Sequence, residues 1–403
     1  MPRKPLEGIK VADFSWSVVG PLTTKTLADY GAEVLKIESS IAPDLFRTLG
    51  PFKDNIPGFN RGGVFNEYNT NKLSVTLNLQ HPKGVQVAKR LAKWADVVVE
   101  NFAQGVMAKI GLSYDELRKV NPGIIYLSSC MMGQTGPHAG HPGWGGFLTA
   151  LAGFDHITGW PDREPVDLGP YTDFVAPPFC VAIIMAAILY RQRTGKGQYL
   201  DVSQYECAIQ LMAPLVLDTV VNKRIPGRIA NRSPYAAPHG AYRCQGRDKW
   251  CAIAVFSDEE WKSLCGVIGN SVLSENSKFA TLLGRKENEK ELDKLIEEWT
   301  TNYPAEDVMI MMQAAGVPAG VLQTGEDIVE HDPQLRQPYY FCELDHPEIG
   351  KYCAPAPSFI LSKSPYELKR APTLGEHTEY ALREILGMAD DEIADLVIEG
   401  VIQ

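Results

Sequence analysis

The sequence predicts an α/β protein in which a Rossmann-like parallel-sheet large domain is interrupted by an inserted small α+β domain. Through the first half of the chain, short apolar runs alternate with helical patterns, the order that gives right-handed crossovers and a parallel sheet. The composition changes near Asn222, and residues 224–238 are rich in Pro, Arg, Ala and Asn, which indicates a linker. The 403 residues also exceed what one compact core usually holds.

The elements of the first half follow in order along the chain. Residues 96–100 form a continuous apolar run typical of a buried parallel strand, and residues 73–79 alternate apolar and polar side chains as a half-exposed strand does. The other strands are expected at 9–14, 34–37 and 124–128, and helices at 23–30, 84–94 and 174–190.

The second half predicts the small domain and a return to the large one. Residues 241–256 indicate a hairpin, and residues 259–303 are helical and charged. A Gly-Val-Pro-Ala-Gly segment at 316–320 interrupts this region, and a second crossing is expected near 331–333, before a loop-rich stretch and a final helix. We therefore expect residues 1–225 to form the first part of the large domain, 226–330 the small domain, and 331–403 the return segment.

The bulk composition excludes several classes of function. A net charge of −10 argues against a nucleic-acid partner. No signal peptide is visible, and the longest apolar stretch, 174–190, contains two prolines and is slightly short for a membrane span, so we expect a buried helix and no membrane contact. The eight cysteines include no Cys-x-x-Cys pair and no zinc spacing, which predicts no metal site and a reducing cytoplasm.

Asp173 closes a Gly-Pro-Tyr-Thr-Asp segment directly before the apolar helix. Its simplest role is that of an N-cap, whose carboxylate accepts backbone N–H bonds. The same position would also suit an ionised nucleophile held at a helix start. No Gly-x-Gly-x-x-Gly, Walker A or Gly-x-Ser-x-Gly motif accompanies it, so nicotinamide, nucleoside-triphosphate and serine-hydrolase chemistry have no direct support.

Three other loops follow expected strands or lie next to one. Asn101-Phe102 and Gly133-Gln134 come after strands, and Lys72 precedes one. Each alone is an ordinary turn or a solvated lysine. Ligands of a parallel α/β sheet bind at the carboxyl ends of its strands, so the convergence of such loops predicts a ligand site.

Taken together, the motifs resemble those of the class III CoA-transferase family (CaiB/BaiF type), which contains formyl-CoA, carnitine and bile-acid CoA-transferases. The order and spacing of the matching pieces are specific, although no single piece is. The pieces lie at residues 5–11, 27–38, 69–74, 95–102, 133–137, 193–198, 316–320 and 374–378. The chain departs from the family at Ala103-Gln104, where a basic residue or proline is usual, and in 243–250, where the glycine-rich lid loop has no clear match.

The resemblance implies a reaction and a set of site residues. Asp173 would be the catalytic nucleophile of an acyl-CoA:carboxylate CoA-transferase that binds no permanent cofactor and takes CoA and acyl-CoA as substrates. Backbone N–H groups near Gly133 would stabilise the tetrahedral intermediates. Two chains would interlock as a homodimer, or as a heteromer with a homologous subunit. The residues expected to contact CoA are Val18, Val19, Lys72, Asn101, Phe102 and Arg47.

The acceptor acid is expected to be bulky and aromatic. The resemblance places Trp16, Trp144 and Tyr171 around the acyl group, together with Gly133 and Gln134. Three rings would form an apolar wall, although each alone could equally fill core space. In these aromatic residues the chain is similar to family members that act on benzylsuccinate with succinyl-CoA as donor.

Three alternatives remain open. An acyl-CoA racemase shares this fold, but family racemases carry a Gly-His-Asp base segment where this chain has Gly143-Trp144-Gly145. An intramolecular CoA transfer would use the same Asp173. A non-catalytic CoA-binding subunit would have no need of that carboxylate.

Overall fold

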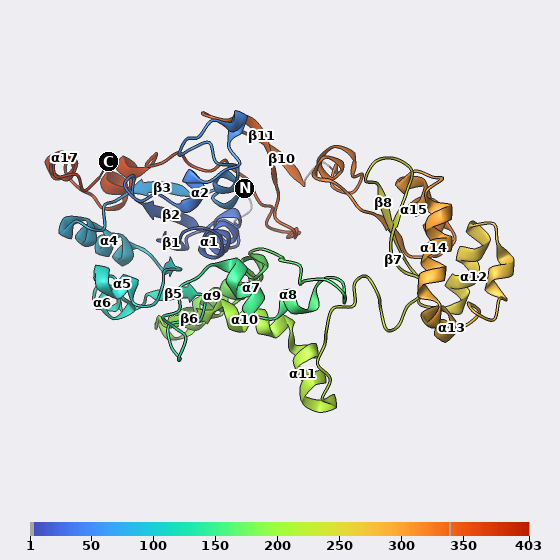
Figure 1. The fold of residues 1–403 in the computed structure, drawn as a ribbon. Coiled ribbons are helices and arrows are strands. Elements are labelled where there is room, and N and C mark those ends of the chain that lie inside the picture. The colour runs from blue at the N-terminus through green and yellow to red at the C-terminus, as the bar shows by residue number, and fades with distance from the viewer. Residues whose placement is uncertain (1–3, 338–339, 403) are drawn as a thin grey trace. The chain divides into compact units, whose positions relative to one another are not determined.

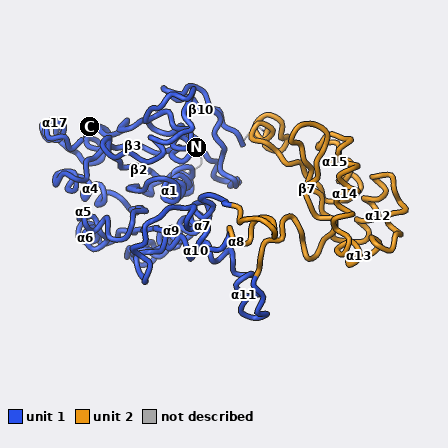
Figure 2. Tube along the Cα trace, viewed as in Figure 1, with its two compact units in different colours: residues 1–154, 167–225, 337–403 blue, residues 155–166, 226–336 orange. Residues whose placement is uncertain are grey.

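The computed structural model describes residues 4–337 and 340–402 and divides into two compact units. Unit 1 comprises Met1–Phe154, Asp167–Ile225 and Gln337–Gln403, and unit 2 comprises Asp155–Val166 and Pro226–Arg336 (Figures 1 and 2). These bounds differ from the expected ones in two places. Residues 155–166 belong to unit 2, and the return to unit 1 begins at 337 instead of 331.

Unit 1 contains a six-stranded parallel sheet with the order β3-β2-β1-β4-β5-β6. This is the strand order of a doubly wound nucleotide-binding fold, in which the chain reverses its winding direction between β1 and β4. The α/β class and the parallel sheet are thus confirmed, and the carboxyl ends of β1 and β4 mark the expected ligand edge. The strands are β1 (Lys10–Asp13), β2 (Glu33–Glu38), β3 (Leu73–Thr76), β4 (Val97–Glu100), β5 (Ile125–Cys130) and β6 (Tyr199–Ser203).

Helices cover both faces of this sheet (Figure 1). On one face, α1 (Val19–Asp29) and α9 (Tyr171–Thr194) pack on side chains of β1, β2, β4 and β5. On the other face lie α4 (Pro82–Trp94), α6 (Tyr114–Val120) and α17 (Asp390–Ile398). The C-terminal helix therefore completes the core that the first residues begin.

Helix α1 starts four residues earlier than the sequence pattern predicts. Pro21 stands in its first turn, where a missing N–H breaks no helical hydrogen bond. The early start brings Val18 and Val19 to the carboxyl end of β1.

Helix α9 is the one described helix that is long and apolar enough, by length and composition, to cross a membrane. Its buried side packs against α1, α7 (Gly145–Leu151) and α10 (Gln204–Leu211), as a core helix does. The expectation of a buried helix is only partly met, because apolar side chains also cover an exposed face. These are Tyr171, Phe174, Phe179, Ile183, Leu189 and Tyr190.

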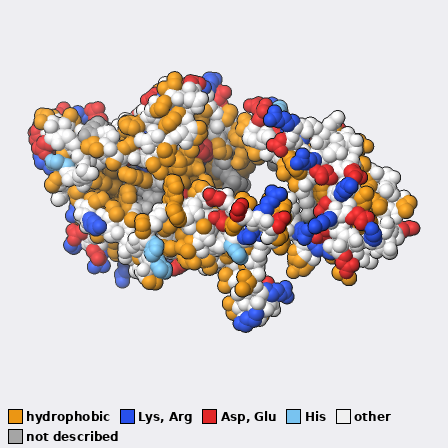
Figure 3. Space-filling view, viewed as in Figure 1, with side chains coloured by type: hydrophobic (Ala, Val, Ile, Leu, Met, Phe, Trp, Pro, Cys, Tyr) orange, Lys and Arg blue, Asp and Glu red, His pale blue; other side chains and the backbone are white. Residues whose placement is uncertain are grey.

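Unit 2 is a small α+β body built on the antiparallel sheet β7-β8-β9. The expected hairpin is β7 (His239–Arg243) with β8 (Trp250–Ala254), and β9 is Ala319–Val321. Helices α12 (Asp258–Val267), α14 (Glu289–Thr300) and α15 (Ala305–Ala314) enclose its core around Trp261. Figure 3 shows Lys, Arg, Asp and Glu side chains interspersed over unit 2, whereas apolar side chains gather on the visible face of unit 1.

The remaining elements are short. Unit 1 also contains the hairpin β10 (Phe341–His346) and β11 (Gly350–Pro355). The shorter helices and turns are α2 (Leu45–Thr48), η1 (Lys53–Asn55), α3 (Gly63–Tyr68), α5 (Val106–Ile110), α8 (Phe154–Ile157), α11 (Ala213–Asn222), η2 (Ser271–Ser274), α13 (Leu282–Glu287), η3 (Asp327–His331), α16 (Thr378–Tyr380) and η4 (Ala381–Ile385).

Candidate active site

Asp173 lines a cavity of about 200 Å³ in unit 1. It is the third residue of α9, whose N-cap is Pro170, so the N-cap role expected from the sequence is wrong. The cavity is lined by the loops that follow β1, β4 and β5, at the edge of the sheet where ligands of this fold bind. Its lining includes Ser17, Val18, Val19, Asn101, Met131, Met132, His141, Trp144, Gly145 and Gln204.

The carboxyl group of Asp173 is largely removed from water. Burial raises its pKa to about 6, and within the described chain no side chain donates a hydrogen bond to it. At neutral pH the group is therefore mostly ionised but poorly solvated. A carboxylate in this state is a better nucleophile than one that water surrounds.

Gly145, the first residue of α7, lies directly against this carboxylate. A Cβ atom placed on Gly145 would come within 2.6 Å of Oδ2 of Asp173, far inside van der Waals contact. The backbone of α7 can approach Asp173 so closely only because residue 145 has no side chain. Gly145 thus fixes one wall of the cavity.

Two helix starts present backbone donors to the cavity. The first N–H groups of a helix have no intrahelical partner, and neither α1 nor α7 has a side-chain cap. Val18, Val19 and Gly145, at these two starts, all line the cavity. Backbone N–H groups here could stabilise an oxyanion formed near Asp173.

Gly133 and Gln134 do not supply such donors in this structure. The N–H of Gln134 donates to the carboxylate of Asp201 at 2.9 Å, and the N–H of Gly133 faces the carbonyl of Cys130 at 3.5 Å. Gln134 lines a separate cavity beside Glu100. The backbone donors expected near Gly133 are therefore engaged elsewhere, and neither residue lines the Asp173 cavity.

Lys72 is buried inside the domain, where its side chain has no exposed surface. Its ammonium group donates to Asp13 at 3.1 Å, to the Pro21 carbonyl at 2.9 Å and to Asn69 at 2.9 Å. Burial lowers its pKa to about 8. All three donors are used, so a contact with a CoA phosphate would first have to break these bonds. The structure thus gives Lys72 an internal structural role.

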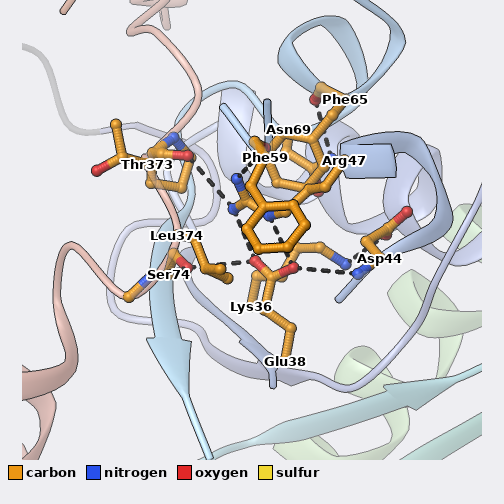
Figure 4. A network of polar contacts seen from close by, with 12 residues as sticks. Lys36, Glu38, Asp44, Arg47, Phe59, Phe65, Asn69, Ser74, Thr373 and Leu374 are labelled. Atoms are coloured by element: carbon orange, nitrogen blue, oxygen red, sulfur yellow. Dashed lines mark hydrogen bonds and ion pairs between the residues drawn. The ribbon is translucent and has the colours of Figure 1, made fainter. Parts of the chain in front are cut away.

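Arg47 is equally inaccessible (Figure 4). Its guanidinium group makes a bidentate pair with Glu38, at 2.9 and 2.7 Å, and donates to Asn60 at 2.8 Å. Its charged carbon lies 3.6 Å from the ring centre of Phe65. The contact with CoA expected for Arg47 is not available in this arrangement.

Phe102 and Trp16 line a second, more apolar cavity of about 300 Å³. Their rings meet edge to face at 5.4 Å, and Phe14 and Ile37 line the same cavity. This cavity lies at the carboxyl ends of β1 to β4, where a nucleotide base would be expected. Asn101 lies in the Asp173 cavity instead, and both ends of its amide bond the backbone of Trp16.

The three aromatic rings do not form one wall. Trp144 lines the Asp173 cavity and is 68% exposed. Trp16 belongs to the second cavity, and Tyr171 packs edge to face on Phe154 at 5.2 Å. Of the three rings only Trp144 lines the Asp173 cavity, and their placement around the acyl group stays a prediction.

Sequence reasoning did not single out Gly145, Lys36 or Asp44 as residues of the site. Gly145 was noted only as part of a segment lacking a base, although the run Gly143-Trp144-Gly145-Gly146 signals a close backbone approach. Lys36 lies on β2, within the matching stretch 27–38, and Asp44 lies on the loop that follows, but nothing in the sequence pairs the two. Only the fold reveals their partners.

The doubly wound domain thus combines a largely buried carboxylate at its ligand edge with an apolar cavity at the nucleotide position, an arrangement that suits covalent acyl transfer. The sequence profile of CoA-transferase family III matches residues 6–378, and the chain belongs to this family. The family assignment made from the motifs is thereby confirmed, and the protein is a CoA-transferase whose relatives are acyl-CoA:carboxylate CoA-transferases.

The relatives extend over the whole chain. Succinyl-CoA:glutarate CoA-transferase of Mus musculus is 31% identical over 403 residues, covering 99% of this chain and 91% of that protein. Succinyl-CoA–D-citramalate CoA-transferase of Chloroflexus aurantiacus is 32% identical over 403 residues, covering 100% and 99%. The crystal structure of a CaiB/BaiF family protein from Brucella suis aligns with a TM-score of 0.87 at 31% identity, covering 95% of this chain and 100% of that one.

Proposed function

We propose that the protein moves CoA from succinyl-CoA to a bulky carboxylic acid through a covalent intermediate on Asp173. The observation that carries the proposal is the position of Asp173, a largely buried carboxylate that lines one cavity together with the uncapped starts of α1 and α7. Succinyl-CoA as donor is supported by the names of the two relatives above, both of which use it.

The covalent route divides a difficult exchange into easier steps. Asp173 attacks the thioester carbonyl and releases CoA thiolate, which leaves a succinyl-aspartyl anhydride. The thiolate attacks the aspartyl carbonyl of the anhydride, so that succinate leaves and aspartyl-CoA remains. The acceptor carboxylate attacks aspartyl-CoA to form a second anhydride, and the thiolate then attacks its acceptor carbonyl. The products are the new acyl-CoA and free Asp173, so that one thioester is consumed and one is formed over the whole cycle.

In the proposed binding mode, acyl-CoA occupies both cavities. The apolar cavity beside Phe102 would accept the nucleotide base, and the pantetheine arm would pass the Ser15–Val18 segment to reach Asp173. Backbone N–H groups at the starts of α1 and α7 would stabilise each tetrahedral oxyanion. Holding the thiolate beside the anhydride contributes up to ~7–11 kcal/mol in ideal cases, because the second attack becomes intramolecular.

The acceptor is proposed to be a benzylsuccinate-like acid with an apolar substituent. Val18, Val19, Met131, Met132 and Trp144 give the cavity an apolar lining, and among the described residues no lysine or arginine lines it. An apolar wall favours a bulky hydrocarbon group over a small, fully polar acid. His141 is the lining side chain best suited to a second acceptor carboxylate.

A competition among acceptors tests this proposal. The protein is incubated with succinyl-CoA and equal concentrations of benzylsuccinate, phenyllactate, glutarate, citramalate, oxalate and carnitine, and new CoA esters are measured by mass spectrometry. We expect benzylsuccinate to give the highest kcat/KM. A clear preference for oxalate or carnitine would contradict the apolar acceptor. Racemised acyl-CoA without transfer would favour the racemase alternative.

The exposed apolar face of α9 supports a dimer as the working form. Large apolar side chains, among them Phe174, Phe179, Ile183 and Leu189, lie exposed along one helix, and such patches mark association surfaces. We propose that a second copy, or a homologous chain, covers them in an interlocked dimer. Two isotopically labelled pools, mixed under native conditions, should show no subunit exchange by native mass spectrometry over hours. Rapid exchange would rule out interlocking.

A further inference from the structure

The loop after β1, residues Ser15–Val18, lies between the two cavities. The side chain of Trp16 lines the apolar cavity, whereas Ser17 and Val18 line the Asp173 cavity. The position of this short segment therefore sets the distance from one cavity to the other. Because its residues lie outside β1 and α1, their backbone groups need other partners.

Buried charged side chains hold both ends of the segment. Asp13 accepts the N–H of Ser15 at 3.0 Å, and the ammonium group of Lys36 donates to the Ser15 carbonyl at 2.7 Å. Asp44 accepts the N–H of Ser17 at 3.2 Å. Lys36 and Asp44 form an ion pair at 2.9 Å, and neither side chain is exposed (Figure 4).

A neutral side chain holds the middle. Asn101 accepts the N–H of Trp16 at 2.8 Å and donates to the Trp16 carbonyl at 2.7 Å. Gly20 closes the loop from the helix side, because a Cβ there would overlap the side chain of Ser15. Every backbone polar group from the Ser15 N–H to the Ser17 N–H thus has a fixed partner.

Ser17 itself is held in an unfavourable conformation. Its φ of 65° lies in the left-handed region, which non-glycine residues seldom adopt. Such a conformation is unfavourable and persists only where surrounding contacts enforce it; it is typical of active sites. Contacts that only stabilised the fold would have no need to hold Ser17 in this strained conformation.

We propose that Lys36, Asp44 and Asn101 are positioning residues for CoA transfer, which fix the Ser15–Ser17 backbone so that a thioester bound along it meets Asp173. None of the three needs to react. The inference rests on the proposed covalent function of Asp173. It predicts that removing the contacts of these three residues with Ser15–Ser17 lowers turnover far more than it weakens CoA binding, since the reacting atoms lose their alignment.

A second buried ion pair provides a control. Lys25 and Asp29 pair at 2.7 Å within α1 and are largely buried, but they make no bond to Ser15–Ser17 and line neither cavity. The test variant is Lys36→Met with Asp44→Leu, and the control is Lys25→Met with Asp29→Leu. Each double variant replaces an ion pair by apolar side chains of similar size, which avoids leaving one buried charge unpaired.

The readouts are kcat and KM for succinyl-CoA, the dissociation constant of CoA by calorimetry, and thermal unfolding. We expect kcat of the test variant to fall by at least ~10-fold while KM and CoA binding change by less than ~3-fold, and kcat of the control to stay within ~3-fold of wild type. Equal losses in both variants, or an unchanged kcat in a folded test variant, would overturn the proposal.

A milder variant covers the case in which the test variant does not fold. Asn101→Asp keeps the acceptor for the Trp16 N–H and loses the donor to its carbonyl, and the same selective fall in kcat is expected. An unchanged kcat in folded Asn101→Asp would also overturn the proposal. Wild-type protein in the same assay separates the two claims: if it transfers no CoA, the proposed function itself fails.

Discussion

Asp173→Ala is expected to lower kcat for CoA transfer by about 10⁴-fold or more, as loss of a covalent nucleophile does in other enzymes. The variant should fold normally, because no side chain in the described chain depends on this carboxylate for a hydrogen bond. Removing it should also relieve the cost of burying a charge, which the raised pKa of Asp173 reports. Steady-state kinetics with succinyl-CoA and circular dichroism check both expectations.

Asp167→Asn is the control for this experiment. Asp167 is an exposed carboxylate six residues earlier that accepts the N–H of Gly169, so its replacement disturbs the same segment without touching the cavity. Its kcat should remain close to that of wild type. If Asp173→Ala kept more than a few per cent of wild-type turnover, Asp173 would not be the nucleophile.

Gly145→Ala is expected to lower kcat by about 10²-fold, with little effect on the free energy of unfolding. The added methyl group would come within 2.6 Å of the Asp173 carboxylate, so that the carboxylate or the start of α7 must move. A displacement of about 1 Å at a reacting group costs on the order of 10²-fold in rate. The measurement is kcat with succinyl-CoA, together with the unfolding midpoint.

Gly146→Ala is a closely matched control. Gly146 is the next residue of the same helix, and a Cβ atom there meets no atom within 4 Å. Both substitutions add one methyl group and raise helix propensity by about 1 kcal/mol. Similar activity in the two variants would show that the contact between Gly145 and Asp173 has no catalytic role.

The fold was predictable because strand and helix patterns are local. The apolar run at 96–100 and the alternation beginning at Leu73 mark β4 and β3 directly, and alternating elements imply a parallel sheet. The starts of α1 and α9 were missed because prolines stand in or next to their first turns. Proline is tolerated there, yet it resembles a breaker in a sequence.

The candidate site was predictable only where one residue carries the chemistry. Asp173 stood out by its place before the apolar helix, but its role as nucleophile came from the family resemblance and stays a prediction. Lys72 and Arg47 were assigned to CoA because a sequence does not show which cations are buried. Their partners, Asp13 and Glu38, are 59 and 9 residues away in the chain. Contacts of this kind depend on strand order, which local patterns do not encode.

The central claim, a covalent aspartyl intermediate, is tested most directly by trapping it. The protein is incubated with succinyl-CoA alone, quenched with hydroxylamine or borohydride, digested, and analysed by tandem mass spectrometry. The account predicts a hydroxamate after hydroxylamine, or a reduced side chain after borohydride, at Asp173, present only with substrate and absent from Asp173→Ala. Unmodified Asp173 in protein that is actively transferring CoA, or a modification at another carboxylate, would contradict it.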